Sequence, residues 1–124
     1  ANQTTRFYTE APLAFGGKVL PPGEYSMFVD LKPAAWTLIF SKQPHQQKYD
    51  PNDKVATWGS TNYDQAHDVL RVRMAVVPNR HSVDQFTIGF VDMTRRQGTL
   101  ALWWERTMAT APFTVADLPP GPPR

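Results

Sequence analysis

Short runs in which apolar and polar side chains alternate recur along the whole chain. The first two lie in the stretch LPPGEYSMFVDLKPAAWTLIFSK at positions 20–42, where residues 25–29 and 36–40 carry an apolar side chain at every second position. A period of two is typical of β-strands, because successive side chains point to opposite faces of a sheet. The break at 31–35 is short and contains Pro33, so we predict that the two runs form an antiparallel hairpin.

The same alternation continues along the rest of the sequence. Clusters of Gly, Pro, Asn and Asp separate the runs, and no segment shows the 3.6-residue period of an amphipathic helix. We therefore predict an all-β fold, an antiparallel β-sandwich or partly open barrel of about seven short strands. Besides the opening hairpin, the predicted strands lie at 6–9, 15–20 around the Gly16-Gly17 turn, 70–76, 86–91, 100–105 and 112–115.

Two segments lack this alternation. Residues 43–66 are polar and too many for an ordinary hairpin loop, so we expect them to have a packing or functional role. The last residues, LPPGPPR at 118–124, form neither helix nor strand ladder, because proline lacks the N–H donor. We predict one β-domain over 1–117 and an extended tail over 118–124. The tail prolines suit contact with another protein surface, and they are Pro119, Pro120, Pro122 and Pro123.

Composition narrows the choice of partner. Of the 124 residues, 41% are hydrophobic and 19% are charged, which is typical of a globular domain. The net charge is +2, and no run of like charge could follow a phosphate backbone, so nucleic acid is not an expected partner. The absence of cysteine excludes disulfides, thiolate metal sites and a cysteine nucleophile. No apolar run is long enough to span a bilayer, so we expect no transmembrane segment in this chain.

Several motifs follow one another between Gly16 and Val115: LPPGEYSMF, WTLIFSK, Tyr49-Asp50, DVLRV, FTIGF and LWWERTMATAPFTV. Each motif alone is only a strand or a turn, but in this order and spacing they resemble a bacterial family of unknown function, DUF2911. The resemblance implies a β-rich, exported domain without an established activity. We therefore expect a periplasmic or otherwise exported protein.

The resemblance also implies a difference at the start of the chain. In the family, a tryptophan–arginine pair and the triplet GAN lie inside the domain, with further strands before them. This sequence begins within that triplet, at Ala1-Asn2. We therefore expect this chain to lack the N-terminal portion of the family's domain, either because it is a processed or partial piece or because the protein has lost those strands, and we expect an export signal upstream of residue 1. A sheet edge left uncovered in this way would pair readily with a strand from a partner.

Metal binding has little support in the sequence. His45 and His67, together with Asp50 or Asp68, are residues that loops could bring together as ligands. His67 and Asp68 are neighbours at the start of a predicted strand, where consecutive side chains point to opposite faces. We favour the alternative that the histidines are solvent-exposed loop residues, and we predict no metal and no cofactor.

Catalysis also has little support. A hydrolase built on Asp68, His67 and Glu105 is an alternative, but the serines lack a nucleophile-elbow context and no glycine-rich phosphate loop is present. For Glu105 we favour an ion pair with an arginine, and the candidates are Arg71, Arg73 and Arg106. We predict no catalytic residue.

The aromatic residues are more informative. Trp103 and Trp104 are consecutive on a predicted strand, so they face opposite sides of the sheet. The phase shared with Leu100 and Leu102 directs Trp104 to the core and Trp103 outward. An outward tryptophan suits a protein interface or a sugar ring, alone or with Trp58 and Tyr49. The alternative is that the long segment carrying Trp58 covers Trp103.

Two functions follow from these features. The first is a non-catalytic accessory subunit that binds a protein partner, on the periplasmic side of a larger membrane-associated assembly. The second is a carbohydrate- or small-ligand-binding module whose platform comprises Trp103, Trp58 and Tyr49.

Overall fold

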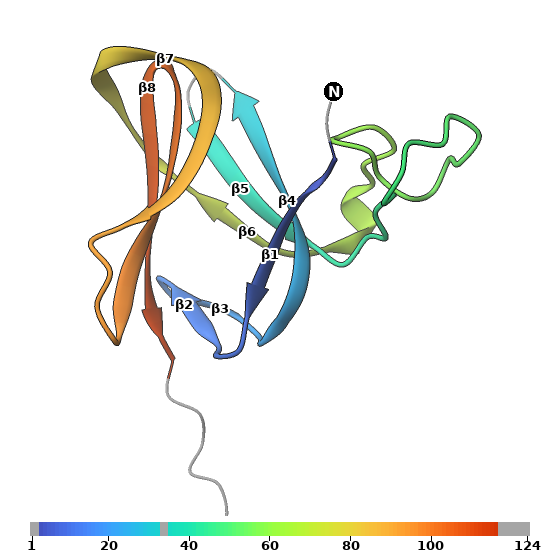
Figure 1. Ribbon diagram of the computed structural model, residues 1–124. Helices are drawn as coiled ribbons and strands as arrows, with labels where there is room; N and C mark the ends of the chain where they lie inside the picture. Colours follow the sequence, from blue (N-terminus) through green and yellow to red (C-terminus); the bar gives the residue numbers. More distant parts are fainter. Residues whose placement is uncertain (1–2, 33–34, 117–124) are drawn as a thin grey trace, which may run out of the picture.

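The computed structural model describes residues 3–32 and 35–116, which form two four-stranded antiparallel sheets (Figure 1). The sheets pack as a sandwich and are not joined into a closed barrel, so the predicted all-β architecture is confirmed. The first sheet has the order β1-β4-β5-β6, with β1 at Thr5–Thr9, β4 at Gly23–Lys32, β5 at Ala35–Ser41 and β6 at Asp68–Arg73. The second has the order β3-β2-β8-β7, with β2 at Leu13–Phe15, β3 at Lys18–Leu20, β7 at Ala75–Val91 and β8 at Gln97–Val115.

The hairpin predicted from the opening alternation is β4 and β5. These strands are antiparallel neighbours, with Met27 opposite Phe40 and Val29 opposite Leu38. Tyr25, Leu38 and Phe40 are almost completely buried, as the period of two predicts. The alternation therefore specifies both the pairing and the face that enters the core.

The core lies between the two sheets and is centred on Phe40. Its ring centroid lies 5.2 Å from that of Phe7 on β1 and 5.5 Å from that of Phe15 on β2. Burial of such an aromatic side chain stabilises the fold by about 1.5–3 kcal/mol. Further buried residues from both sheets complete the core, including Leu13, Leu20, Trp36, Val72, Leu100, Leu102, Ala109 and Phe113.

The second hairpin, β7 and β8, is much longer than the sequence pattern predicts. Its strands have 17 and 19 residues, and they include the predicted runs at 86–91, 100–105 and 112–115. Their register shifts twice, since Pro78 lies opposite Thr107 and Thr87 lies opposite Trp103. β7 has extra residues between these pairs, which bend the hairpin as β-bulges do. The polar residues of the bulged part resemble a loop in the sequence, which hides the continuity of the strand.

The bulge also changes which face of β8 enters the core. Glu105 stands at the shift with φ +52°, in the left-handed region. Before it, the buried leucines occupy even positions, at Leu100 and Leu102, and after it the buried residues occupy odd positions, such as Ala109 and Phe113. A simple period of two therefore fails across Glu105. The run predicted at 70–76 is likewise divided, because β6 ends at Arg73 and β7 starts at Ala75.

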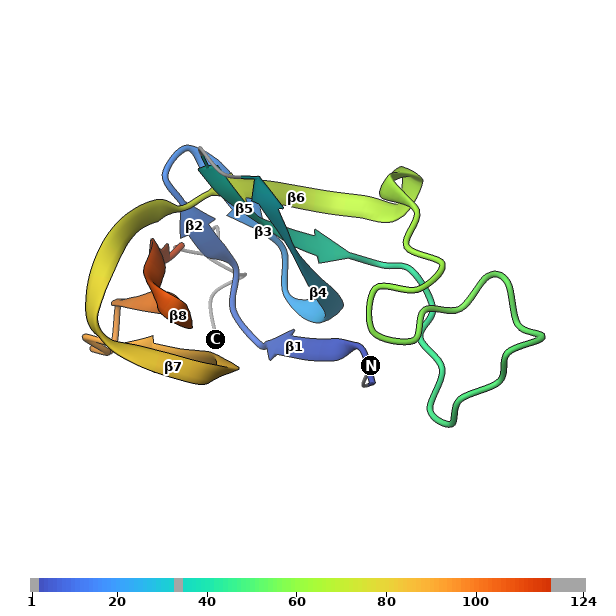
Figure 2. The same ribbon diagram turned by 90° about the horizontal axis from the view of Figure 1, so that it is seen from above.

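The two sheets approach each other at both sides (Figure 2). At one side, Nζ of Lys18 on β3 donates a 2.9 Å hydrogen bond to the carbonyl of Arg71 on β6. At the other, the ring centroids of Phe7 on β1 and Phe90 on β7 are 6.1 Å apart. Side-chain contacts, and not a strand ladder, therefore bring β7 close to the first sheet.

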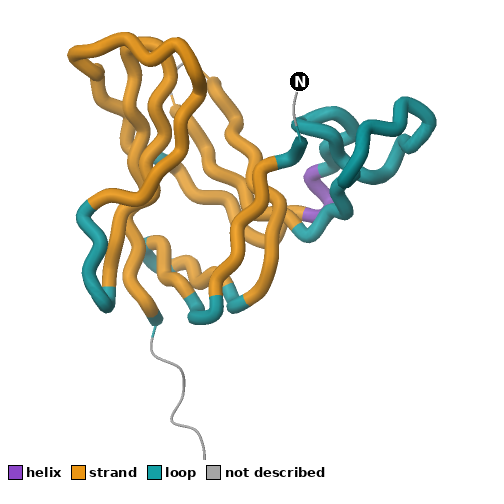
Figure 3. Tube along the Cα trace, viewed as in Figure 1, coloured by secondary structure: helices purple, strands orange, loops and turns teal. Residues whose placement is uncertain are grey.

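The long polar segment predicted at 43–66 is a structured loop between β5 and β6 (Figure 3). It contains a 3-10 turn, η1, at Gln65–His67. The buried Gln43 side chain holds it together, since Nε2 donates to the carbonyls of Val55 and Asn62 and Oε1 accepts from the Asp64 amide. Within the described part of the chain, no helix has the length and apolar character needed to cross a membrane.

Candidate functional site

The outer edge of β7 is the most unusual surface of the molecule. β7 is the last strand of its sheet, and none of its 17 residues is buried. Four of its exposed side chains are large and apolar: Val76, Val77, Phe86 and Phe90. Natural proteins shorten, charge or cover a long apolar edge of this kind, because it can pair with another chain. Several exposed apolar side chains along one strand are a feature of interaction surfaces.

A cavity of about 320 Å³ lies between β4 and β7. Its apolar wall includes Val29 and Leu31 from β4 and Phe86 and Ile88 from β7. Polar groups from Gln3, Thr5, Gly59 and Ser60 lie at the cavity, and none of the described residues that line it is charged. The cavity exists because β1 covers only part of the edge of β4.

The uncovered part of β4 can be read from the strand register. β1 pairs with residues 23–27 of β4, while β5 pairs with residues 26–32 on the other side. Within the described chain, residues 28–32 therefore have no strand partner on the β1 side. At Thr4 the chain turns toward the long loop, where Oγ1 of Thr4 donates to the carbonyl of Gly59 at 2.9 Å and contacts Oγ1 of the buried Thr57 at 2.8 Å. The free edge of β4 thus faces the cavity.

Two of the three predicted aromatic platform residues lie together. The ring centroids of Tyr49 and Trp58 in the long loop are 5.6 Å apart, and Tyr49 is 56% exposed. The loop and the β7–β8 hairpin project from opposite sides of the molecule (Figures 1 and 2). Trp103 on β8 is therefore separate from this pair, and the structure does not form a single platform from all three residues.

The two consecutive tryptophans face as the strand phase predicts. Trp104 packs against the core, with its ring 6.2 Å from that of Phe86. Trp103 is half-buried on the other face, where it lies over Gly89 so closely that a Cβ there would be 3.2 Å from Cζ3 of the indole. The alternative that the Trp58 loop covers Trp103 gains no support, because Gly59 and Ser60 of that loop lie with Phe86 and Ile88 on the core-facing side of β7, whereas Trp103 lies on the other face.

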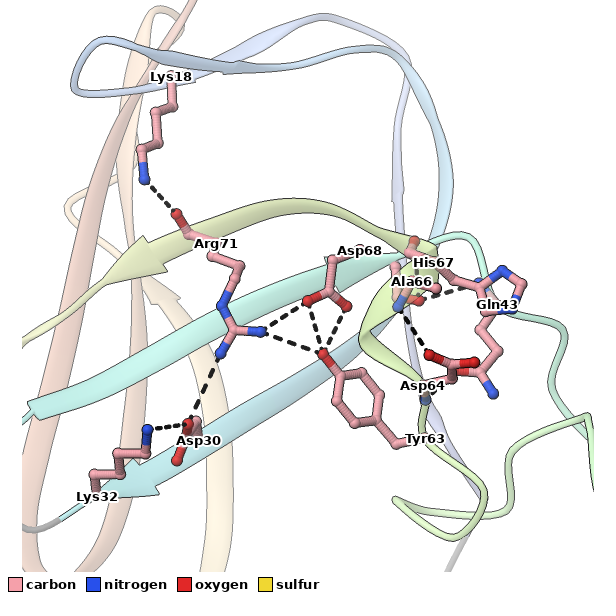
Figure 4. Close-up of polar contacts among 11 residues, drawn as sticks. Lys18, Asp30, Lys32, Gln43, Tyr63, Asp64, Ala66, His67, Asp68 and Arg71 are labelled. Atoms are coloured by element: carbon pink, nitrogen blue, oxygen red, sulfur yellow. Dashed lines mark hydrogen bonds and ion pairs between the residues drawn. The ribbon is translucent and has the colours of Figure 1, made fainter.

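Asp68 belongs to a polar cluster that joins the long loop to the first sheet (Figure 4). The Tyr63 hydroxyl donates to its two carboxylate oxygens at 2.6 and 2.8 Å, and Nη1 of Arg71 donates to Oδ2 at 2.8 Å. Arg71 also forms an ion pair with Asp30. Burial, followed by the Asp68 hydrogen bond, raises the pKa of Tyr63 to about 12. The hydrogen bond to Asp68 also raises the pKa of Arg71.

This geometry does not assemble the hydrolase residues considered above. Asp68 is occupied by Tyr63 and Arg71, while Glu105 lies on β8 in the other sheet. The predicted ion pair of Glu105 is wrong, since Arg71 pairs with Asp30 and Asp68, and neither Arg73 nor Arg106 forms an ion pair with Glu105.

The histidines considered as metal ligands lie in and around the long loop. His45 forms an isolated bridge with Thr57, and His67 ends the 3-10 turn. Across residues 3–32 and 35–116, no three His, Asp or Glu side chains are grouped as a metal site requires. The tail prolines proposed for partner contact, Pro119, Pro120, Pro122 and Pro123, lie outside the described residues.

The sequence pattern missed the residues that form the cavity. Leu31 lies in what was expected to be the turn after the first strand, and Phe86 begins a predicted strand without any sign that it faces another sheet. The only available signal was Leu31 itself, an apolar residue that continues the alternation of Tyr25, Met27 and Val29 into a position that a short hairpin would leave exposed.

Comparison with known families gives one match. Residues 1–113 match a family described as a protein of unknown function, DUF2911. No curated protein and no solved structure matches the chain.

Proposed function

The chain belongs to the DUF2911 family, and from this premise we propose that it is a non-catalytic accessory subunit that binds another protein through the open edge of β7. One observation carries this proposal. β7 presents 17 residues without a single buried one, and its exposed side chains include Val76, Phe86 and Phe90. Covering them in a complex would remove apolar surface from water, which stabilises the complex by about 25 cal/mol for each Å² buried.

The charges on the β7–β8 hairpin favour a specific protein contact over nonspecific apolar association. Arg80 on β7 and Arg106 on β8 form no ion pair with a described carboxylate, although Nη1 of Arg106 donates to the carbonyl of Arg80. Unpaired arginines beside exposed aromatic rings are common in protein interfaces. Carboxylates on the partner would complete these contacts and orient the complex.

The size of the native assembly tests the proposal. In the organism that encodes the protein, a tagged full-length copy should elute in gel filtration well above the mass of its own monomer, to which residues 1–124 contribute 14.0 kDa. Phe86→Lys should return it to the size of a monomer, because a buried ammonium in the interface lacks a partner. Val19→Lys is the matched control, since Val19 is an exposed apolar residue on β3 at the opposite end of the same sheet. A wild-type protein that elutes as a monomer would contradict the proposal.

We also propose that this subunit works outside the cytoplasm, at the periplasmic face of a membrane-associated assembly. The support is the family resemblance, together with the absence of cysteine, which makes folding independent of the redox state of the compartment. Osmotic-shock fractionation should release the full-length protein with periplasmic markers, or leave it in the membrane pellet until detergent is added. Recovery with cytoplasmic markers would contradict this location.

A ligand-binding role is the second candidate, and it rests on the loop aromatics. The exposed Tyr49 and the half-buried Trp58 form an aromatic pair that suits stacking on a sugar ring. Titration with a sugar panel should then change the tryptophan fluorescence, and Trp58→Ala should abolish the change. If only the interaction role holds, the fluorescence stays constant with every sugar.

A further inference from the structure

We propose that the cavity between β4 and β7 receives an extended segment of the partner protein, which adds a strand to the free edge of β4 in line with β1. This inference rests on the proposed interaction function and names the part of the surface at which the partner chain enters. The bound segment is a β-strand antiparallel to β4, and the side chains that it turns into the cavity are uncharged and mainly apolar.

The backbone of β4 supplies the first argument. β1 begins at Thr5, which lies opposite Met27. Residues 28–32 of β4 extend beyond this N-terminal end of β1 and pair only with β5 in the described chain. Unpaired N–H and C=O groups along a strand edge are the usual acceptors of an added strand, which gains affinity from main-chain hydrogen bonds. Five residues of strand span about 17 Å. A partner segment of this length would continue the first sheet from the point where β1 leaves it.

The side chains that line the cavity supply the second argument. A strand in line with β1 turns every second side chain toward the second sheet. There it meets Phe86 and Ile88 from β7, beside Val29 and Leu31 of β4. A volume of about 320 Å³ is at the small end of the range for binding cavities, which suits a few side chains better than a whole ligand. Phe86 and Leu31 are 39% and 45% exposed, so both remain to be covered.

The polarity of the cavity defines the chemistry of the segment. Its lining within residues 3–32 and 35–116 carries no charge, so a charged side chain that entered would lose water without gaining a partner there. Gln3, Thr5 and Ser60 lie near the end at which β1 begins. An antiparallel segment therefore has apolar residues first and a hydrogen-bonding residue, such as serine, threonine or asparagine, toward its C-terminal end. Antiparallel pairing matches every other strand pair of this sheet.

Peptide selection tests this inference directly. The wild-type chain is used to select binders from a phage-displayed library of random twelve-residue peptides, with the Leu31→Lys variant as the counter-selection. We expect enrichment of uncharged segments with an apolar residue at every second position. The selected peptide, labelled with fluorescein, should bind Leu31→Lys and Phe86→Lys at least about tenfold more weakly than wild type in anisotropy titrations. Val19→Lys should bind it as wild type does.

Two further measurements separate strand addition from general apolar binding. N-methylation of the peptide amides that pair with β4 should abolish binding, because the methyl group removes the donor and blocks the approach. Bound peptide should slow hydrogen exchange in residues 28–32. Thermal unfolding of each lysine variant confirms that it is folded, and both substituted positions are already exposed.

The inference is overturned if no peptide is enriched over the counter-selection. It is also overturned if the selected peptides bind Leu31→Lys as well as wild type, or tolerate N-methylation. If the native protein is still found in a large assembly that depends on Phe86, only the strand-addition site is wrong and the interaction function stands. If the native protein is also a monomer, both fail.

Discussion

Tyr63 is the residue that fastens the long loop to the first sheet. Its hydroxyl donates to both oxygens of Asp68, and its ring lies 4.6 Å from that of Phe28 on β4. Neither neighbour is visible in the sequence pattern, because Phe28 occupies a position that the alternation assigns to the polar face. The contact explains why this apolar residue faces outward and is nevertheless buried.

Removing the Tyr63 hydroxyl should destabilise the protein. We expect Tyr63→Phe to lower the free energy of unfolding by about 1–2 kcal/mol, since Asp68 loses one of its charged hydrogen bonds while the ring contact is kept. Urea denaturation measures the effect. Tyr49→Phe is the control, because Tyr49 is exposed and should change the stability by less than about 0.5 kcal/mol. Equal stability of Tyr63→Phe and wild type would show that Arg71 alone satisfies Asp68.

Tyr63 also makes the stability of the protein change with pH in the alkaline range. The pKa of Tyr63 is about 12 in the folded chain, against 10.0 for an unperturbed tyrosine, so the folded state holds the proton more tightly than the unfolded state. The stabilisation is therefore complete below pH 10 and is lost as the pH rises from 10 toward 12. Between pH 9 and about pH 11, urea denaturation should show a smaller loss of unfolding free energy in Tyr63→Phe than in wild type, because the variant lacks this titrating hydroxyl. Parallel losses in the two proteins would contradict this assignment.

At the scale of elements, the two hairpins show what a period of two can and cannot predict. The β4–β5 hairpin is regular, so its alternation predicts the strands, their pairing and their buried face. In β7 and β8 the register shifts twice, and the buried positions change phase at Glu105. The shift depends on a backbone conformation that the sequence does not reveal, since most residues with positive φ are glycine and this one is glutamate.

Glu105 therefore offers a test of the bulge. A non-glycine residue at φ +52° pays a conformational cost that glycine avoids. We expect Glu105→Gly to raise the free energy of unfolding by about 0.5 kcal/mol, while Arg106→Gly, at the neighbouring position in the strand, lowers it by about 1 kcal/mol. Thermal and urea denaturation give both values. Destabilisation by both substitutions to a similar degree would show that Glu105 has a contact which outweighs its backbone strain.

The long loop depends on buried amides that its polar sequence does not distinguish from exposed ones. Gln43 makes three side-chain hydrogen bonds within the loop, whereas Gln47 is exposed. We expect Gln43→Ala to lower the free energy of unfolding by about 2–3 kcal/mol and to make residues 44–66 sensitive to limited proteolysis. Gln47→Ala should change neither property. Proteolysis that stays slow in Gln43→Ala would mean that the remaining side-chain hydrogen bonds of the loop, such as those of Gln46 and Asn62, hold it without Gln43.

At the scale of the whole molecule, the described residues of both sheets share one core, while the outer edge of β7 and residues 28–32 of β4 on the β1 side have no strand partner among them. Ring contacts join the two sheets at Phe15–Phe40, 5.5 Å apart, and at Phe7–Phe90, 6.1 Å apart, and the described residues alone bury Phe7, Phe15 and Phe40. The sequence predicted an antiparallel all-β fold, either a sandwich or a partly open barrel, because this much follows from alternation alone. It could not predict which strand lies at the edge, since strand order depends on contacts between residues far apart in the chain.

This combination predicts how residues 1–124 behave when they are produced alone. We expect a cooperative thermal transition, because the core is closed, together with reversible self-association that grows with protein concentration, because the β7 edge is uncovered. Light scattering during thermal unfolding and sedimentation below the transition measure the two properties separately.

Substitutions on the edge should separate these two properties. Val76→Lys together with Phe86→Lys should suppress self-association and leave the midpoint of unfolding within a few degrees of wild type, since both side chains are exposed. Val19→Lys, on the opposite edge, should leave both the self-association and the midpoint of unfolding as they are in wild type. If the double variant loses the transition, the edge residues belong to the core and the strand is not free. If wild type stays a monomer at every concentration, the edge is protected without a partner, and the interaction proposal loses its main support.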